Sequence, residues 1–345
     1  TQLWGSLVMT AMLPGLAGCG PDPMPEAPAS RQSAAAPAKN LLMHYMPWYE
    51  TPSVRGQWGR HWTGHEAQHD PDRQGEDGLP DIWSKYHPLI GLYDSADPDA
   101  LECHLLQMKL AGIDGVIVDW YGIGQTDDYP SIHMATRSMF DMAGRLGMTF
   151  AVCFEDRTVE LLMTREKLQP DQVASHLVET LGWMQEHWFR QPHYVRLQDR
   201  PLVLNFGPMV VTNAAPWATA FAPLPQRPAF YGLHHLWREV DADGGFTWVH
   251  HDPWEGTPTP ERVRERIGEV FTYFSSDPGE VIVSAYPGFD DVYDPPLRSL
   301  DHRGGDTLSA TLDVAMAGPR PVVQLETWND YGEGTMIEPT HEFGY

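Results

Sequence analysis

Eight short apolar segments, separated by stretches with helical spacing, are the feature that most constrains the fold of this chain. Strands that alternate with helices form parallel sheets, and eight such strands can close into a barrel. We therefore predict an α/β fold built as a single (β/α)8 TIM barrel. The apolar segments are 41–46, 115–120, 149–154, 201–206, 229–234, 246–250, 281–286 and 322–327.

The segments between the predicted strands carry helix start and stop signals. Asp97 and Pro98 suit the beginning of a helix, and Gly112 suits its end. The crossovers after the fourth and fifth strands are rich in Pro and Gly instead, so an open doubly wound sheet stays the alternative. Because the chain ends at Tyr345, soon after the eighth strand, we expect the last helix of the barrel to be missing. Further helices are predicted over 131–147, 170–188, 259–274 and 306–318.

The first 39 residues have a composition unlike the remainder of the chain. Residues 1–19 are apolar, lack Lys and Arg, and end in Leu16-Ala17-Gly18-Cys19. This resembles a partial bacterial lipoprotein signal peptide, in which Cys19 carries the lipid. Residues 20–39 form a Pro/Ala-rich tether without apolar periodicity, so 40–345 is the predicted catalytic domain. We expect a lipid-anchored protein of the bacterial cell envelope, periplasmic or surface-exposed, that meets the membrane only through the anchor.

Composition narrows the class of partner. The formal net charge is -24 and the isoelectric point is about 4.9. There is no basic excess to neutralise phosphates, which argues against nucleic acid and anionic membrane surfaces. The 13 Trp, 13 Tyr and 12 Phe exceed ordinary packing needs and favour a ring-lined site for a neutral substrate. The sequence does not indicate an oligomeric state.

Polar and aromatic residues follow nearly every predicted strand. In a (β/α)8 barrel, functional groups lie at the carboxyl ends of the strands. Aromatic rings pack on the apolar faces of sugars, while carboxylates, amides and imidazoles form hydrogen bonds with hydroxyl groups. We therefore predict a pocket for a poly- or oligosaccharide. Its predicted substrate-binding residues are His44, Tyr45, Trp48, Tyr49, Asp119, Tyr121, Glu155, Asn205, His234, His250, Tyr286, Asp290, Trp328 and Asn329.

The segment after the eighth strand contains four acids within fourteen residues. Glycoside cleavage uses two carboxyl groups, one protonated and one ionised. Asp330 and Glu333, three residues apart, can hold different pKa values because ionising one disfavours ionising the other. We predict Glu333 as the general acid and Asp330 as its partner, and we interpret Glu326 and Glu338 as structural. The alternative for the pair is a loop held by carboxylate to backbone hydrogen bonds.

Metal sites are the main chemical rival. The pairs His234-His235 and His250-His251 are adjacent in sequence, so on a strand their side chains point to opposite faces. The stretch 288–294 holds three aspartates but lacks the spacing of a calcium-binding loop. Cys103 and Cys153 fall within helix and strand patterns and are interpreted as buried thiols. We therefore predict no metal site and no cofactor.

Four motifs carry a resemblance to known enzymes. They are HYMPWY at 44–49, GIDGVIVDWYG at 112–122, AYPGFDD at 285–291 and WNDYGEGTMIEP at 328–339. Together they resemble glycoside hydrolase families 71 and 99, which are (β/α)8 enzymes that act on α-linked glycans. The resemblance implies a glycosidase.

The last motif divides between the two families. Family 99 has a similar W-N-E-W-H-E-G-T motif, whose first Glu assists the substrate's own 2-hydroxyl as nucleophile and whose second is the general acid/base. The resemblance assigns these roles to Asp330 and Glu333. WNDYGE is similar instead to family 71, the inverting α-1,3-glucanases, whereas GTMIEP is similar to family 99. Mannan and glucan, retention and inversion, and endo and exo action all stay open. A non-catalytic surface glycan-binding lipoprotein is the alternative from another class.

Overall fold

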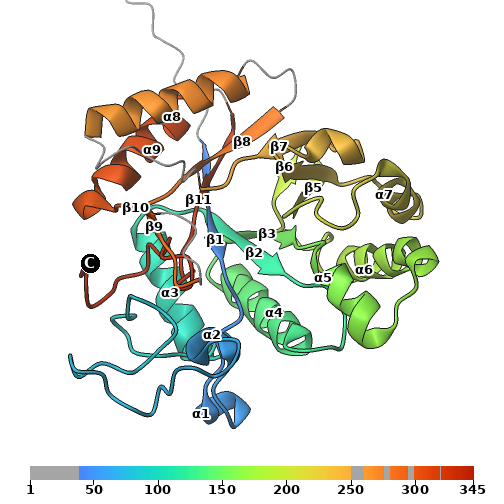
Figure 1. The fold of residues 1–345 in the computed structure, drawn as a ribbon. Helices are drawn as coiled ribbons and strands as arrows, with labels where there is room; N and C mark the ends of the chain where they lie inside the picture. The colour runs from blue at the N-terminus through green and yellow to red at the C-terminus, as the bar shows by residue number, and fades with distance from the viewer. Residues whose placement is uncertain (1–38, 250–259, 276–279, 294–298, 319) are drawn as a thin grey trace, which may run out of the picture. The chain divides into compact units, whose positions relative to one another are not determined.

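Parallel strands close into a barrel, as Figure 1 shows. The computed structural model describes residues 39–249, 260–275, 280–293, 299–318 and 320–345. The predicted signal segment with Cys19, nearly all of the tether, and His250 lie outside the described residues. In barrel order the strands are β3 (Thr149–Phe154), β2 (Gly115–Trp120), β1 (Asn40–Tyr45), β11 (Val322–Leu325), β8 (Glu280–Ala285), β7 (Gly244–Phe246), β6 (Ala229–Leu233) and β5 (Arg200–Asn205).

The barrel is closed because β3 also pairs with β5, in parallel like the other barrel pairs. This confirms the predicted (β/α)8 fold over the open sheet. Minor strands add an antiparallel edge, β4 (Arg196–Leu197), and a separate pair, β9 (Phe289–Asp290) with β10 (Ser299–Leu300).

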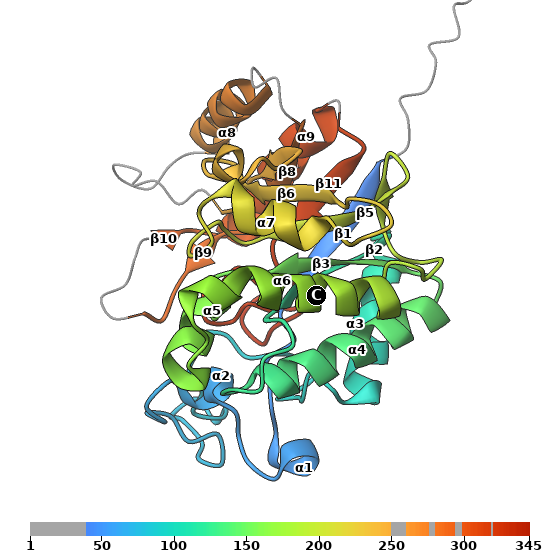
Figure 2. The same cartoon turned by 90° about the vertical axis from the view of Figure 1, so that its right-hand side faces the viewer.

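Helices surround the strands on both sides in Figures 1 and 2. The fourth crossover, expected to be irregular, contains the helix α7, which Asn213 caps through its side chain. The fifth crossover has only the 3-10 helix Trp237–Val240. The helices are α1 (Pro52–Arg55), α2 (Arg60–Thr63), α3 (Pro98–Leu110), α4 (Tyr129–Arg145), α5 (Thr158–Leu161), α6 (Val173–His187), α7 (Ala214–Phe221), α8 (Pro260–Ser275) and α9 (Asp306–Ala317). Single turns of other type are Leu162–Glu166, Pro170–Gln172 and Arg303–Gly305.

The alternation of side chains along each strand separates two cores. Leu42 and Ile117 point into the barrel, where they belong to the same apolar cluster as Leu204. Met43 and Tyr45, one residue away from the inward positions, belong to the cluster between strands and helices. This alternation decides which residues at a strand end can reach the interior.

The sixth barrel strand differs from its prediction. The apolar run 246–250 was expected to form it, but β7 is Gly244–Phe246. A Cβ at Gly245 would lie 2.8 Å from the Trp237 ring, so only a glycine fits this close approach. As a result Trp248 stands beyond the strand end. Among the described residues, no helix is long and apolar enough to cross a membrane.

Candidate active site

A cavity of about 480 Å³ opens at the carboxyl ends of the barrel strands. Its walls combine acids, bases and rings, as predicted for a sugar pocket. The lining residues are His44, Met46, Trp48, Tyr49, Arg60, His61, His65, Trp83, Asp119, Tyr121, Tyr129, Glu155, Arg157, Thr158, Phe206, Trp248, Tyr293, Asp330, Gly332 and Glu333.

Four carboxyl groups from three strands meet in this cavity. Asp119 lies near the end of β2, Glu155 directly follows β3, and Asp330 and Glu333 follow β11. All four were predicted to belong to one site. Because the ends of parallel strands meet at one rim of a closed barrel, residues that are 36 to 214 positions apart in sequence become neighbours.

The loop that carries Asp330 and Glu333 is held by its own hydrogen bonds. The Asp330 amide donates to Thr327 Oγ1 at 2.8 Å, and the Glu333 amide donates to Asp330 Oδ1 at 3.0 Å. The Tyr331 amide donates to Tyr49 Oη at 3.2 Å. The loop is therefore stapled by a carboxylate to backbone bond, as the alternative prediction held, and both carboxyl groups still face the cavity.

Burial and like charge raise the pKa values of this pair. Burial, followed by the nearby Asp330 carboxylate, holds the pKa of Glu333 well above its ordinary value, while a hydrogen bond from the Trp248 side chain opposes the shift. Burial raises the pKa of Asp330 to about 6, against the lowering effect of backbone hydrogen bonds from Glu333 and Gly332. Asp330 thus ionises first and Glu333 keeps its proton longer.

The other two acids are also perturbed. Burial raises the pKa of Glu155 to about 7, although the guanidinium of Arg157 favours the ionised form. Burial and then the Glu155 carboxylate raise the pKa of Asp119 well above its ordinary value. Several groups with shifted pKa values facing one cavity are typical of an active site.

One contiguous segment between β1 and α3 builds much of the cavity rim. It contributes Arg60, His61, His65 and Trp83. The His61 ring stacks on Trp48 with ring centroids 4.4 Å apart and planes at 8°. Arg60 forms ion pairs with Asp127 and Asp128 beyond the end of β2, which fixes the segment to the barrel.

The two ends of this rim segment are clamped together. The Tyr49 amide donates to Ser95 Oγ at 3.0 Å, and the Ser95 amide donates to the Tyr49 carbonyl at 2.8 Å. The Thr51 amide donates to Asp94 Oδ2 at 3.0 Å. The segment therefore leaves and rejoins the barrel at nearly the same point.

A second polar group, the rear network, lies behind the cavity wall. Asn329 joins the two ends of the neighbouring strands, because its side chain accepts from the Met46 amide at 2.8 Å and donates to the Met46 carbonyl at 2.9 Å. Tyr93 Oη accepts from Asn329 Nδ2 at 3.1 Å and donates to Glu338 Oε2 at 2.8 Å. Glu338 Oε1 lies 3.1 Å from His104 Nε2, within ion-pair distance though not aligned as a hydrogen bond.

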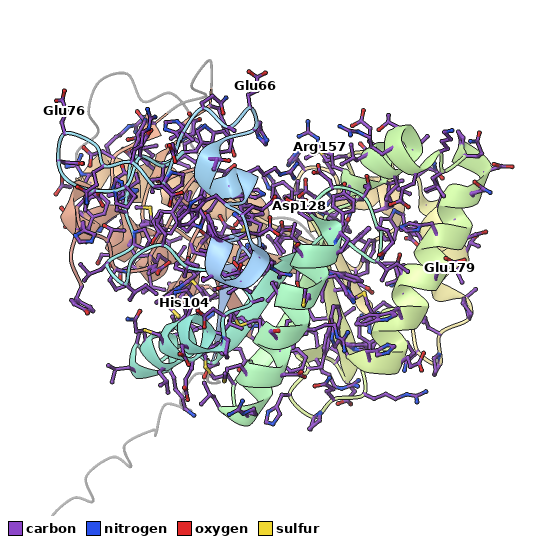
Figure 3. All side chains as sticks on the ribbon, turned by 90° about the horizontal axis from the view of Figure 1, so that it is seen from below. Glu66, Glu76, His104, Asp128, Arg157 and Glu179 are labelled. Carbon is purple, nitrogen blue, oxygen red and sulfur yellow. The ribbon has the colours of Figure 1, made fainter. Side chains whose placement is uncertain are left out.

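In Figure 3, His104 of the rear network is labelled beside helix α3. It lies apart from the labelled Arg157 and Asp128, which are near the cavity rim. All members of the rear network are buried. Glu338 is held in this network and does not line the cavity, which supports its interpretation as structural.

Three predicted substrate-binding residues belong to these supporting contacts instead of the cavity wall. Tyr45 points outward from β1 and its hydroxyl lies 3.2 Å from His104 Nδ1. Trp328 packs in the same outer core as Tyr45, and Asn329 is occupied by Met46 and Tyr93. Side-chain alternation turns Tyr45 away from the interior that His44 reaches.

Four further predicted residues also lie outside the lining. Asn205 is fully buried, and Tyr286 packs with Phe289 and Leu300. Asp290 forms an ion pair with Lys85 on the partly exposed surface. His234 stacks edge-on with His235 beyond β6. The remaining predicted residues, His44, Trp48, Tyr49, Asp119, Tyr121, Glu155, Asp330 and Glu333, line the cavity.

Sequence reasoning missed the basic and aromatic residues that loops supply. Arg60, His61 and His65 form a short basic cluster after the first strand, and Tyr293 sits inside the quoted stretch 288–294. Tyr293 lies near both catalytic candidates, since their carboxylates contribute to raising its pKa. A cluster of basic residues is unusual in so acidic a chain, and the rim residues could have been predicted from it.

Comparison with known proteins identifies the family. A model described as glycosyl hydrolase family 99 matches residues 38–229. The chain belongs to glycosyl hydrolase family 99. It is similar to the glycoprotein endo-alpha-1,2-mannosidase of Mus musculus, with 32% identity over 94% of this chain and 73% of the relative. The Rattus norvegicus protein of the same name is 31% identical over 88% of this chain and 68% of the relative.

A solved family 99 structure has the same fold. The GH99 endo-alpha-mannosidase from Bacteroides thetaiotaomicron, in complex with bis-tris-propane, matches with a TM-score of 0.63 and 20% identity, and the match covers 87% of each chain. The predicted family 99 likeness and the predicted glycosidase class are thereby confirmed.

Proposed function

We propose that this family 99 glycosidase cleaves α-linked mannan within the chain, with Glu333 as general acid/base and Asp330 as the partner carboxylate. The substrate class is supported by the names of the relatives, which are endo-alpha-1,2-mannosidases and an endo-alpha-mannosidase. The catalytic assignment rests on one observation. Two carboxyl groups on one short loop, the buried Asp330 and the half-buried Glu333, face the same cavity and differ in how readily they lose a proton.

The proposed first step breaks the glycosidic bond. Glu333 gives its proton to the glycosidic oxygen while the bond from that oxygen to C1 breaks. Asp330 accepts the proton of the 2-hydroxyl, and the 2-oxygen attacks C1 to form a 1,2-anhydro sugar. The shorter side chain of Asp, relative to the family motif's Glu, requires the sugar to approach the Asp330 loop more closely.

The proposed second step opens the anhydro sugar with water. The Glu333 carboxylate now accepts a proton from the water that attacks C1, and Asp330 returns its proton to the 2-oxygen. Both carboxyl groups end in their starting states, and two displacements at C1 retain the α configuration. A raised pKa for Glu333 and a lower one for Asp330 match the starting protonation states.

The remaining lining residues are assigned to substrate binding. Asp119 and Glu155 are placed to accept hydrogen bonds from sugar hydroxyls, and Trp48, Tyr121 and Trp248 offer ring faces or edges to the sugar. Trp48 is already backed by its stack on His61, which limits its freedom before substrate arrives.

We also propose that the protein acts at the bacterial cell envelope through a lipid on Cys19. The support is the sequence Leu16-Ala17-Gly18-Cys19 followed by the Pro/Ala-rich tether. Metabolic labelling with a clickable palmitate analogue is expected to mark the protein, and Cys19→Ala is expected to abolish the label while Cys103→Ala keeps it.

Product analysis tests the proposed reaction. The protein is incubated with α-mannan and, separately, with α-1,3-glucan, and the first product is followed by proton NMR. We expect new reducing ends from mannan only, initially in the α form. An initial β product would overturn the proposed retaining route. Release from the glucan alone would overturn the substrate, and tight glycan binding without any release would favour a binding protein.

A further inference from the structure

We propose that His44, Asp119 and Cys153 form a binding site for a thiophilic divalent cation, such as Zn²⁺, in the floor of the cavity. One ligand atom from each residue, an imidazole nitrogen, a carboxylate oxygen and the thiol sulfur, lies within 4.8 Å of the other two. The residues come from the neighbouring strands β1, β2 and β3. The proposal concerns a site beyond the hydrolytic reaction.

Strand register brings the three side chains to one interior face. Asp119 pairs directly with Cys153 between β2 and β3. His44 pairs with Ile117, which is two residues before Asp119 and therefore on the same face of β2. Ile117 and Cys153 belong to the apolar cluster inside the barrel. All three candidate ligands thus point inward at adjacent levels.

The His44 ring supplies the independent sign of a ligand. Its side chain is only 1% exposed. Within the described part of the chain, neither ring nitrogen has a partner at hydrogen-bonding geometry, although the Gln324 amide is close enough to interact with the ring. Buried polar groups are normally satisfied, so an imidazole with only this imperfect contact to Gln324 has a ring nitrogen available to a ligand.

The charges around the floor favour a cation. Asp119 feels the carboxylates of Glu155, Asp330 and Glu333, and each of them disfavours its ionisation. A divalent ion beside Asp119 would offset this repulsion and would also favour the thiolate of Cys153. Neutral histidine, thiolate and carboxylate together are ligands that zinc accepts.

The geometry suits an open three-ligand site. Zinc bonds of about 2.0–2.3 Å put tetrahedral ligand atoms about 3.3–3.8 Å apart. Rotations that move the side-chain atoms by about 1 Å close the present arrangement to that size. His44 and Asp119 also line the cavity, so the fourth position of the ion faces the sugar site. Bound Zn²⁺ is therefore expected to compete with the glycan.

Cobalt substitution tests the site without any glycan. The full-length protein, stripped of metal with a chelator, is titrated with Co²⁺ and followed by absorption. We expect one equivalent to give a thiolate-to-cobalt charge-transfer band with the visible bands of a four-coordinate ion. The band is expected to vanish in Cys153→Ser, which keeps the side-chain size, and in Cys153→Ala. Cys19→Ala and Cys103→Ala are the matched controls and are expected to keep it.

Zinc competition measures the other ligands. With a chromophoric chelator, we expect His44→Ala and Asp119→Asn to weaken zinc binding at least tenfold. A wild-type protein without the charge-transfer band, or a band unchanged in both Cys153 variants, would overturn the site. Because these measurements need no substrate, their result does not depend on whether the proposed hydrolysis is observed. If hydrolysis is observed, Cys153→Ser is expected to keep metal-free turnover and to lose inhibition by Zn²⁺.

Discussion

The two faces of the loop 326–338 use carboxyl groups in opposite ways. On the cavity face, Glu333 Oε2 has no hydrogen-bond partner among the described residues, and burial beside Asp330 raises its pKa. On the rear face, Glu338 accepts from Tyr93 and lies within ion-pair distance of His104. These 13 residues of chain therefore hold one acid that lies beside another acid in the cavity and one acid that lies among polar side chains behind it.

The two faces differ in the groups that surround their carboxyl groups. Glu338 is buried and Glu333 is half-buried, but the Oε2 atom of Glu333 is also withdrawn from solvent. An acid beside another acid keeps its proton to a higher pH, as at Glu333, whereas Glu338 holds the Tyr93 hydroxyl and lies beside the His104 ring. The comparison predicts that changes on the cavity face cost activity and changes on the rear face cost stability.

The largest expected effect is on the cavity face. Glu333→Gln removes the proposed proton donor with little change of shape and is expected to lower kcat/KM on α-mannan by about 10²- to 10⁴-fold. The melting temperature is expected to stay the same or rise, because Gln has no proton to lose beside the Asp330 carboxyl group. The exposed Glu66 labelled in Figure 3 provides the control Glu66→Gln. Unchanged turnover in Glu333→Gln would end the assignment.

The pH dependence of kcat/KM follows from the same face. Asp330 must be ionised and its pKa is about 6, so the rate is expected to fall about tenfold per pH unit below 6. Glu333 must be protonated, so the rate is expected to fall again as pH rises through its raised pKa. A profile from pH 4 to 9 measures both limbs. A rate that is flat between pH 4 and 6 would contradict the role of Asp330.

Stability is expected to change with pH in a defined direction. The pKa of Glu155 is raised from 4.5 to about 7 in the folded protein. The folded state therefore binds more protons than the unfolded state between these values, and the free energy of unfolding falls as pH rises from about 4.5 to 7. Urea unfolding at several pH values measures the slope. Glu155→Gln is expected to flatten it, and an unchanged slope would contradict the shift.

Substitutions on the rear face are expected to lower the free energy of unfolding more than the activity. Glu338→Ala leaves the Tyr93 hydroxyl and the His104 ring without their carboxylate, and we expect unfolding to become easier by about 1–3 kcal/mol. Activity per folded molecule is expected to fall less than in Glu333→Gln. Urea unfolding with parallel rate measurements checks both. A larger loss of turnover than of stability would move Glu338 to the catalytic side.

The smallest effect is expected outside both faces. Asp290, once predicted to bind substrate, pairs with Lys85 at a partly exposed site. Because exposed ion pairs contribute little, Asp290→Asn is expected to change stability by less than about 0.5 kcal/mol and kcat/KM by less than about twofold. A strong loss of activity would mean that the substrate reaches past the cavity to the β9 strand.

The fold was largely predictable, because the spacing of apolar residues that marks a strand or a helix can be recognised in a short stretch of sequence. Seven of the eight barrel strands lie within a residue or two of their predicted bounds, and the closure followed from their number. The exception, β7, starts at Gly244-Gly245, where tight packing demands residues that carry no apolar signal. There the close contact with Trp237 in the folded chain requires a glycine, so the sequence lacks the apolar pattern by which a strand is predicted.

The site was only partly predictable, because the direction in which a side chain points depends on how the strands pair in the fold. The sequence identifies polar residues at strand ends, but it does not separate the inward His44 from the outward Tyr45. Asp119 and Cys153 likewise become neighbours only because β2 pairs with β3, and their spacing in the sequence does not predict this contact. For the same reason the prediction of no metal site weighed the adjacent histidines, the aspartates of 288–294 and the cysteines separately, and did not combine residues from different strands.

The clamp at residues 49–51 and 94–95 has a consequence for how substrate preference can evolve. Everything between these points is one excursion that starts and finishes at a single place on the barrel, while Asp119, Glu155, Asp330 and Glu333 are anchored elsewhere. The excursion also contacts the loop that carries Asp330 and Glu333, because Ser84 Oγ donates to the Tyr331 carbonyl at 3.1 Å. A relative that exchanges or resizes this segment is therefore expected to keep that contact, so that the carboxyl groups stay in place. Diversity in the glycans that such barrels accept is expected to concentrate in this exchangeable piece.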